Sequence, residues 1–255
     1  MTLEAQAGPS APDPRMLQSA WRGFQQLRSG SGLVLAANVI ALLVLIAALA
    51  SLASMVPRHG PAEPADLEDL INQVGGILVA VLAGLALAFI VMLAGFLRML
   101  SAAGSFASLG SRFQRGATGS KLIIGGIGVD ILGLLLLAGG AWAGSLGLAV
   151  AGAGLVLLGS LAVLVGWIMF SLFISSLSEL SIGGFRAPDG FKTAGILLLI
   201  GIVLNMASAV SPTAGTLGVA LDLVAFILIY VYSGQALEEL RKAARGLPVP
   251  LDSWG

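Results

Sequence analysis

The sequence has 255 residues, of which 57% are hydrophobic and only 10% are charged, and its mean hydropathy is +0.99. Soluble domains carry about 25% charged residues, so this composition excludes an ordinary soluble domain. The net charge of zero argues against a nucleic-acid-binding protein. The chain has no cysteine and one histidine, His59, which excludes thiol chemistry, disulfides and histidine metal clusters. We therefore expect a multi-pass protein of the lipid bilayer that is not an enzyme and binds no cofactor or metal.

Six apolar stretches in the sequence have about the 20 residues needed to cross the hydrocarbon core of a bilayer. We predict an all-α fold, a membrane bundle of six transmembrane helices arranged as three consecutive helical hairpins. The transmembrane domain is expected to cover residues 33–235. Its predicted spans are 33–55, 74–97, 121–143, 146–174, 191–210 and 216–234.

Residues 1–32 precede the first span and are expected to form a cytoplasmic tail. From Arg15 onwards, Leu17, Trp21, Phe24 and Leu27 fall on one face of a helix. A basic amphipathic helix that carries Trp typically lies in the membrane interface. The alternative is a cytosolic segment that only leads into the first span. The following apolar run is longer than the core of a signal peptide, which favours a retained span.

The second span carries a small residue at every fourth position, at Gly76, Ala80, Gly84 and Ala88. Small residues allow two helices to approach closely in lipid, where apolar side chains alone give little reason to associate. This stripe therefore predicts one close helix contact.

The two spans at 121–143 and 146–174 carry the most regular glycine pattern in the chain, with glycines seven residues apart in each span. Folding the stretch as a hairpin about a turn near Trp142 predicts that Gly140 faces Gly152, Gly133 faces Gly159 and Gly126 faces Gly166. Asp130 falls on the same helix face as these glycines. We expect this hairpin to be the packing centre of the bundle.

After this hairpin, Gly183–Gly184 predict the end of a helix that continues beyond the fourth span. Asp189 follows a proline and is expected to be the N-cap of the next span. Residues 236–255 are expected to form a cytoplasmic C-terminal helix and tail.

Positive charges predict the orientation of the six spans, because cytoplasmic loops carry the excess of Lys and Arg. With both termini on the cytoplasmic side of the cell membrane, only Arg58 of the 13 Lys and Arg residues falls outside. The twelve on the inner side are Arg15, Arg22, Arg28, Arg98, Arg112, Arg115, Lys121, Arg186, Lys192, Arg241, Lys242 and Arg245.

Three similar segments lead into the odd-numbered spans, beginning at Phe24, Phe113 and Phe191. Each is followed by a polar residue within the span, namely Asn38, Asp130 and Asn205. This spacing indicates a threefold hairpin repeat, unless these residue types recur by chance in a glycine-rich chain.

The segments Leu177-Ser-Glu-Leu180 and Gly190-Phe-Lys-Thr-Ala-Gly-Ile-Leu-Leu-Leu-Ile-Gly201 resemble archaeal polytopic membrane protein families of unknown function. The resemblance covers roughly residues 173–235. It implies a membrane architecture and no particular activity.

Four polar residues within the spans form the candidate site: Asp130, Asn38, Asn205 and Asp222. Acids in spans are costly and are therefore functional candidates. Asp130 is expected near the bilayer midplane, roughly 14 Å deep at 1.5 Å per residue. Asn205 and Asp222 are expected at similar depths and within reach of a hydrogen bond. The two acids do not fit an intramembrane protease, whose carboxyl groups must meet.

The sequence supports two hypotheses of different kinds. The first is a structural or partner-binding membrane subunit, with a cytosolic or membrane protein or anionic lipid as its partner. The alternative is a small transporter or channel component in which Asp130 is a proton or cation site. A transporter requires polar groups that converge on a cavity, whereas a scaffold requires only helix interfaces and a docking surface.

Overall fold

The computed structural model describes residues 13–55 and 64–244. It contains six long helices: α1 (Pro14–Met55), α2 (Pro64–Ala107), α3 (Gln114–Trp142), α4 (Leu146–Ser176), α5 (Gly190–Ala207) and α6 (Pro212–Ala243). Short 3-10 turns lie at Ser111–Phe113 (η1) and Leu177–Glu179 (η2), and strands β1 (Ser181–Ile182) and β2 (Phe185–Arg186) form a small hairpin. All six helices contain a stretch long and apolar enough to cross a membrane. The protein is therefore a multi-pass membrane protein, as composition predicted.

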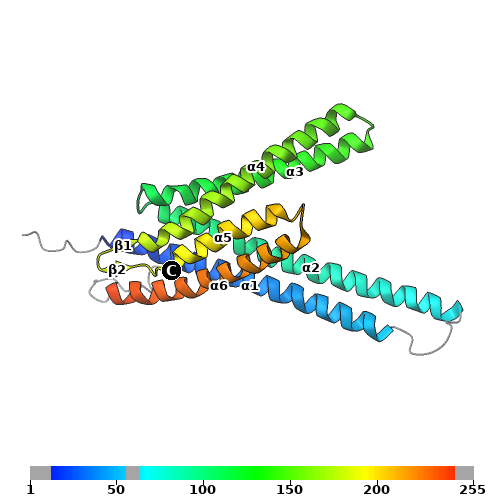
Figure 1. Cartoon of the computed structure of the whole chain (residues 1–255), viewed down its shortest axis with the longest axis horizontal. Coiled ribbons are helices and arrows are strands. Elements are labelled where there is room, and N and C mark those ends of the chain that lie inside the picture. The colour runs from blue at the N-terminus through cyan, green and yellow to red at the C-terminus, as the bar shows by residue number, and fades with distance from the viewer. Residues whose placement is uncertain (1–12, 56–63, 245–255) are drawn as a thin grey trace, which may run out of the picture.

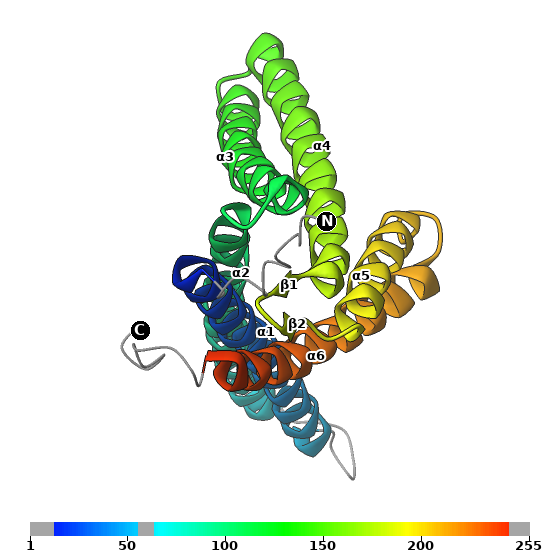
Figure 2. The same ribbon diagram turned by 90° about the vertical axis from the view of Figure 1, so that its left-hand side faces the viewer.

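The helices pair in sequence order, so that α1 packs on α2, α3 on α4 and α5 on α6. This confirms the predicted three consecutive hairpins. Figures 1 and 2 show that the hairpins share one end of the molecule and then point in different directions. Away from the shared end, α1–α2 and α3–α4 separate. The bundle is thus joined at one end and open at the other.

The core lies at the shared end, where the base of the α3–α4 hairpin contributes to it, and not along the rest of that hairpin. Phe24, Phe106, Phe173 and Phe191 are all fully buried there. The ring of Phe24 lies 4.9 Å from that of Phe106 and 5.5 Å from that of Phe191, measured between centroids. Such aromatic contacts stabilise a core beyond the area that they bury. The prediction of α3–α4 as the packing centre is wrong, because most of the large apolar side chains beyond its base are exposed.

The prediction of an interfacial helix before the first span is also wrong. Its apolar residues Leu17, Phe24 and Leu27 are fully buried against protein. They belong to α1, which continues without a break into the first span. An apolar helix face can cover a membrane surface or a protein core, and here it covers the core. The expected C-terminal helix similarly begins as a continuation of α6, with Ala236 and Leu240 buried.

A glycine packs against an aromatic ring at the base of every hairpin. Any Cβ added to Gly23 would collide with the ring of Phe106, one added to Gly116 with Phe173, and one added to Gly190 with Tyr232. In each hairpin the glycine lies on the first helix and the ring on the second. This recurrence supports the predicted hairpin repeat, as does the burial of its three leading residues, Phe24, Phe113 and Phe191.

Glycine contacts within α3–α4 confirm that the six predicted packing glycines are buried, but in a different register. A Cβ at Gly133 would lie 2.8 Å from the carbonyl oxygen of Gly152, and one at Gly126 would lie 2.7 Å from that of Gly159. Both pairings are displaced by seven residues from those predicted. The turn that contains Gly144, at φ 64°, sets this register.

The other predicted glycines of the α3–α4 hairpin are also displaced from their predicted partners. Gly166 faces Gly119, which the sequence pattern did not include, and Gly140 faces the backbone of Leu148 and Ala149. On α2 only the second half of the predicted stripe of small residues packs against another part of the protein. Ala88 is buried and Gly84 lies against Val44, whereas Gly76 has no neighbour within 4 Å.

Between α4 and α5 the chain forms a β-hairpin that the sequence analysis missed. Gly183 and Gly184 have φ values of 53° and 88° and make its turn, the backbone that a two-residue hairpin requires. They therefore do not cap a helix. Asp189 does occupy the N-cap position of α5, but its side chain makes no capping hydrogen bond. It lies 3.5 Å from Arg186 in an exposed ion pair.

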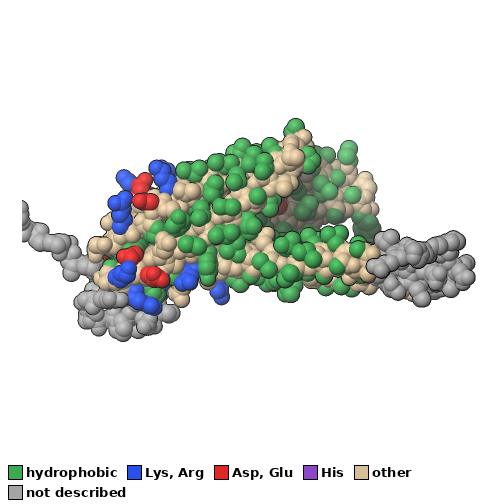
Figure 3. All heavy atoms as spheres, turned by 60° about the horizontal axis from the view of Figure 1, so that its bottom comes forward, with side chains coloured by type: hydrophobic (Ala, Val, Ile, Leu, Met, Phe, Trp, Pro, Cys, Tyr) green, Lys and Arg blue, Asp and Glu red, His purple; other side chains and the backbone are tan. Residues whose placement is uncertain are grey.

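Charged side chains gather at the end that holds the core, whereas the helices beyond it are covered by hydrophobic side chains (Figure 3). We call this the charged end. It brings together basic residues from α1, α2, α3, α6 and the segment between α4 and α5, as the charge pattern predicted. Arg58, His59 and Arg245 lie outside the described residues.

Candidate functional site

Asp130 lies in the interface between α3 and α4. The hydroxyl of Ser160 is 3.3 Å from its Oδ1 and donates a hydrogen bond to it. The same oxygen lies directly over Gly159, where an added Cβ would collide with it. The absence of a side chain at Gly159 therefore makes room for the carboxyl group. Asp130 is partly exposed and bonds within its own hairpin.

Asn205 and Asp222 form the predicted hydrogen bond between α5 and α6. The side-chain amide of Asn205 donates to Oδ2 of Asp222 over 2.8 Å. Two glycines make room for this pair, since a Cβ at Gly201 would collide with Asp222 and one at Gly218 would collide with Asn205. The second oxygen, Oδ1 of Asp222, is buried without a hydrogen-bond partner among the described residues. The pair therefore joins the two helices of the third hairpin.

Asn38 lies apart from the other three candidates. Its side-chain amide donates to the carbonyl oxygen of Val34, one turn earlier on α1, over 2.8 Å. It lines a groove of about 230 Å³ between α1 and α2, beside Ala88 and Phe89. The four candidate residues thus occupy three separate hairpins and do not converge on one centre.

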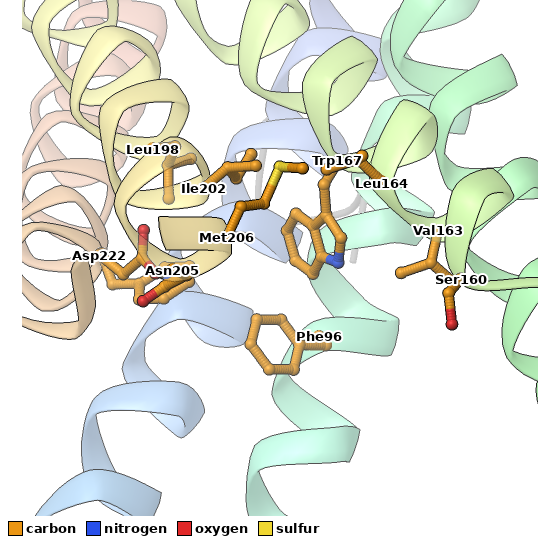
Figure 4. Close-up of a pocket in the computed structure, with 11 residues that line it drawn as sticks. Phe96, Ser160, Val163, Leu164, Trp167, Leu198, Ile202, Asn205, Met206 and Asp222 are labelled. Atoms are coloured by element: carbon orange, nitrogen blue, oxygen red, sulfur yellow. Dashed lines mark hydrogen bonds between the residues drawn. The ribbon is translucent and has the colours of Figure 1, made fainter. Parts of the chain in front are cut away.

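A larger crevice opens between α4 and the α5–α6 hairpin, with α2 at its base (Figure 4). Its volume is about 400 Å³. Asn205 and Asp222 line one wall and Ser160, the hydrogen-bond partner of Asp130, lines another. Most of the remaining lining is apolar, consisting of Phe96, Val163, Leu164, Trp167, Leu198, Ile202, Met206 and Phe226.

Aromatic rings form the part of the crevice that sequence reasoning did not identify. The ring of Phe96 lies 5.3 Å from Trp167 and 5.8 Å from Phe226, so it bridges α4 and α6. Trp167 also lines this crevice. These residues carry no distinctive local pattern, because each lies in a span that contains other aromatic residues, such as Phe89, Phe170 and Tyr230.

No metal centre is formed within residues 13–55 and 64–244, where no three His, Cys, Asp or Glu side chains are grouped closely enough to hold an ion. The chemistry available to the crevice comes from one carboxyl group, one amide and one hydroxyl. These groups can hydrogen-bond to a neighbour or stabilise a cation.

Comparison with protein families gives one match. Residues 21–253 match the model of the DUF973 family, which is described as a protein family of unknown function. The chain belongs to the DUF973 family. No curated protein and no solved structure matches it. The DUF973 match covers α1 from Trp21 onwards and the other five helices, whereas the resemblance seen in the sequence covered only the last part of the chain.

Proposed function

We propose that this DUF973 protein is a non-enzymatic membrane subunit that binds another membrane protein in the crevice between α4 and α5–α6. The observation that carries the proposal is the divergence of the hairpins, which leaves this crevice open on a largely apolar surface. A transmembrane helix of a partner would bury the exposed face of Met206, which lines the crevice and is 58% exposed.

The placement of the polar residues also supports binding over catalysis or transport. Asp130, Asn205 and Asp222 each bond within their own hairpin, as expected of groups that fix helix packing. The single carboxyl group at the crevice has no histidine or cysteine beside it, so a nucleophile activated by a base is not formed from its lining residues.

We also propose that the charged end faces the cytoplasm and is attracted to anionic lipid. Inner leaflets carry negative charge, and each nearby Lys or Arg adds about 1 kcal/mol of attraction. The native chain has no cysteine, so single cysteines can test this orientation. A cysteine at Ser181, in β1, should react with a membrane-impermeant thiol reagent only from the cytoplasmic side. A cysteine at Ala143, in the turn between α3 and α4, should react only from outside. The reverse labelling would contradict the orientation.

Site-specific crosslinking tests the proposed partner. A photoreactive residue placed at Met206, in the crevice, should yield a discrete protein adduct in native membranes. The control is Leu135, which is 66% exposed on α3 and does not line the crevice. Filling the crevice with Ile202→Trp should abolish the adduct. Lipid adducts alone at both positions would overturn the proposal.

A transporter or channel component is the second candidate, with Asp130 as an intramembrane proton or cation site. It is favoured by one observation: Ser160 connects Asp130 to the same crevice that Asn205 and Asp222 line. The test is ion flux in reconstituted vesicles. Flux that Asp130→Asn abolishes, in a variant that still folds, would favour transport over the subunit proposal.

A further inference from the structure

A second hollow lies at the charged end, between the first part of α1 and the last part of α6. Its volume is about 480 Å³, and its lining includes Trp21, Arg28, Tyr230, Glu238 and Arg241. We call it the α1–α6 groove. Gly32 and Gly234 also line it, and their lack of side chains keeps the groove open between the two helices.

Each arginine of the groove packs on an aromatic ring of the opposite helix. The guanidinium carbon of Arg28 lies 5.3 Å from the centroid of the Tyr230 ring, and that of Arg241 lies 5.8 Å from the centroid of the Trp21 ring. Cation–π contacts of this kind hold a guanidinium group in place, and its several N–H donors allow it to bind an oxyanion in addition to another neighbour. The two arginines are therefore pre-positioned on either side of one groove.

The Arg28 side chain makes no hydrogen bond or ion pair in the part of the chain that the structure describes, and the residue is exposed. Among the described residues that line the groove, Glu238 is the only acidic one. Two guanidinium groups and one carboxylate give these described lining residues one net positive charge. This charge matches a ligand that carries one phosphodiester.

The groove lies where the charged end meets the lipid-facing surface. Along α1 the next large apolar residue that is exposed is Val39, at 56%, and along α6 Ile227 and Val231 are 44% and 43% exposed. Trp and Tyr are enriched at the level of lipid headgroups, and this groove contains one of each. A phosphate in the groove would thus have apolar helix surface beside it for acyl chains.

We propose that the α1–α6 groove binds the phosphate of an anionic phospholipid between Arg28 and Arg241. Arg binds phosphate through paired N–H donors. The inference rests on the proposed attraction of the charged end to anionic lipid, but different experimental results would contradict each of the two proposals. A general attraction depends on all basic residues alike, whereas a groove site depends on Arg28 and on open space beside Gly234.

Native mass spectrometry of the purified full chain in detergent tests the site, with phosphatidylglycerol as the probe and phosphatidylcholine as the neutral comparison. Arg28→Gln should weaken the tightest phosphatidylglycerol binding by about tenfold or more, since hydrogen bonds to charged groups are individually strong. The matched control is Arg98→Gln. Gly30 packs on Gly95 and Met99 of α2, so Arg98 lies at nearly the same depth as Arg28 but outside the groove.

Two further variants separate lipid binding from folding. Gly234→Leu should fill the groove and weaken binding although it removes no charge, since a Cβ at Gly234 already lies 3.5 Å from the Arg28 guanidinium carbon. Glu238→Gln should tighten phosphatidylglycerol binding, because it removes the negative charge beside the phosphate. A variant that merely disturbed the fold would not tighten binding.

Several outcomes would overturn the proposal. Equal weakening by Arg28→Gln and Arg98→Gln would show a general surface attraction without a groove site. Unchanged binding in Arg28→Gln and Gly234→Leu would place the lipid elsewhere. Displacement of the lipid by millimolar inorganic phosphate would show that the groove recognises a free phosphate and not a phospholipid.

Discussion

Gly159 of α4 lies directly against the carboxyl group of Asp130 on α3, at a position where any side chain would collide with it. The same glycine approaches the carbonyl oxygen of Gly126. One residue therefore determines both how closely the two helices pack and whether an acid can be accommodated between them. Because the contact lies inside a single hairpin, we expect substitutions at Gly159 to change the stability of that hairpin.

Gly159→Ala should destabilise the α3–α4 hairpin by about 1–3 kcal/mol, as expected when a methyl group is forced into a well-packed interface. Unfolding in bicelles measures this loss. The matched control is Gly154→Ala on the same helix, where an added Cβ has no neighbour within 4 Å. That variant should be neutral or slightly stabilising, because Ala favours a helix. A Gly159→Ala protein as stable as the control would contradict the close approach.

The Asn205–Asp222 hydrogen bond should couple α5 to α6. Asn205→Ala leaves the Asp222 carboxyl group without its partner, and the free energy of unfolding should fall. A double-mutant cycle with Asp222→Ala should give a coupling energy between about 0.6 and about 1.7 kcal/mol, the average and the largest value typical of hydrogen bonds within membranes. Additive effects of the two substitutions would mean that the bond does not stabilise the hairpin.

Phe24→Ala should be among the most damaging single substitutions, because the ring is fully buried between Phe106 and Phe191. Loss of a buried phenylalanine costs about 3–5 kcal/mol. Phe89→Ala is the control, since Phe89 is 59% exposed on the lipid-facing surface. Thermal unfolding followed by circular dichroism should show a much larger fall for Phe24→Ala. Equal effects would argue against a core at the charged end.

The β-hairpin turn should tolerate only certain residues at Gly184, whose φ is 88°. Gly184→Val should destabilise the protein by about 1–3 kcal/mol, because a β-branched residue is strained at positive φ. Gly184→Asn should be milder, because Asn adopts this conformation more readily. An added Cβ has no neighbour within 4 Å, so a collision cannot explain the difference. Limited proteolysis of the hairpin would detect a loosened turn.

The exposed ion pair between Arg112 and Glu179 should contribute little, although its atoms are 2.8 Å apart. Both side chains are more than half exposed, and such pairs typically contribute about 0–1 kcal/mol because water and salt screen them. Arg112→Gln should therefore leave the thermal midpoint almost unchanged. A large loss would show that the link between η1 and η2 is shielded from solvent in the membrane-bound protein.

The sequence by itself determined the number of helices, their pairing into hairpins and the clustering of basic residues at one end. These properties depend on local quantities: the length of each apolar run and the cost of placing a charge in lipid. The Asn205–Asp222 contact also followed, because two antiparallel helices joined by a short turn bring residues at equal depth together.

Only the tertiary structure decided the register of α3 on α4, the position of the core and the separation of the candidate residues. Glycines seven residues apart fit two registers equally well, and the turn at Gly144 selects one of them. The apolar face of Leu17 and Phe24 could cover either lipid or protein. Its burial depends on rings contributed by α2 and α5, from distant parts of the chain.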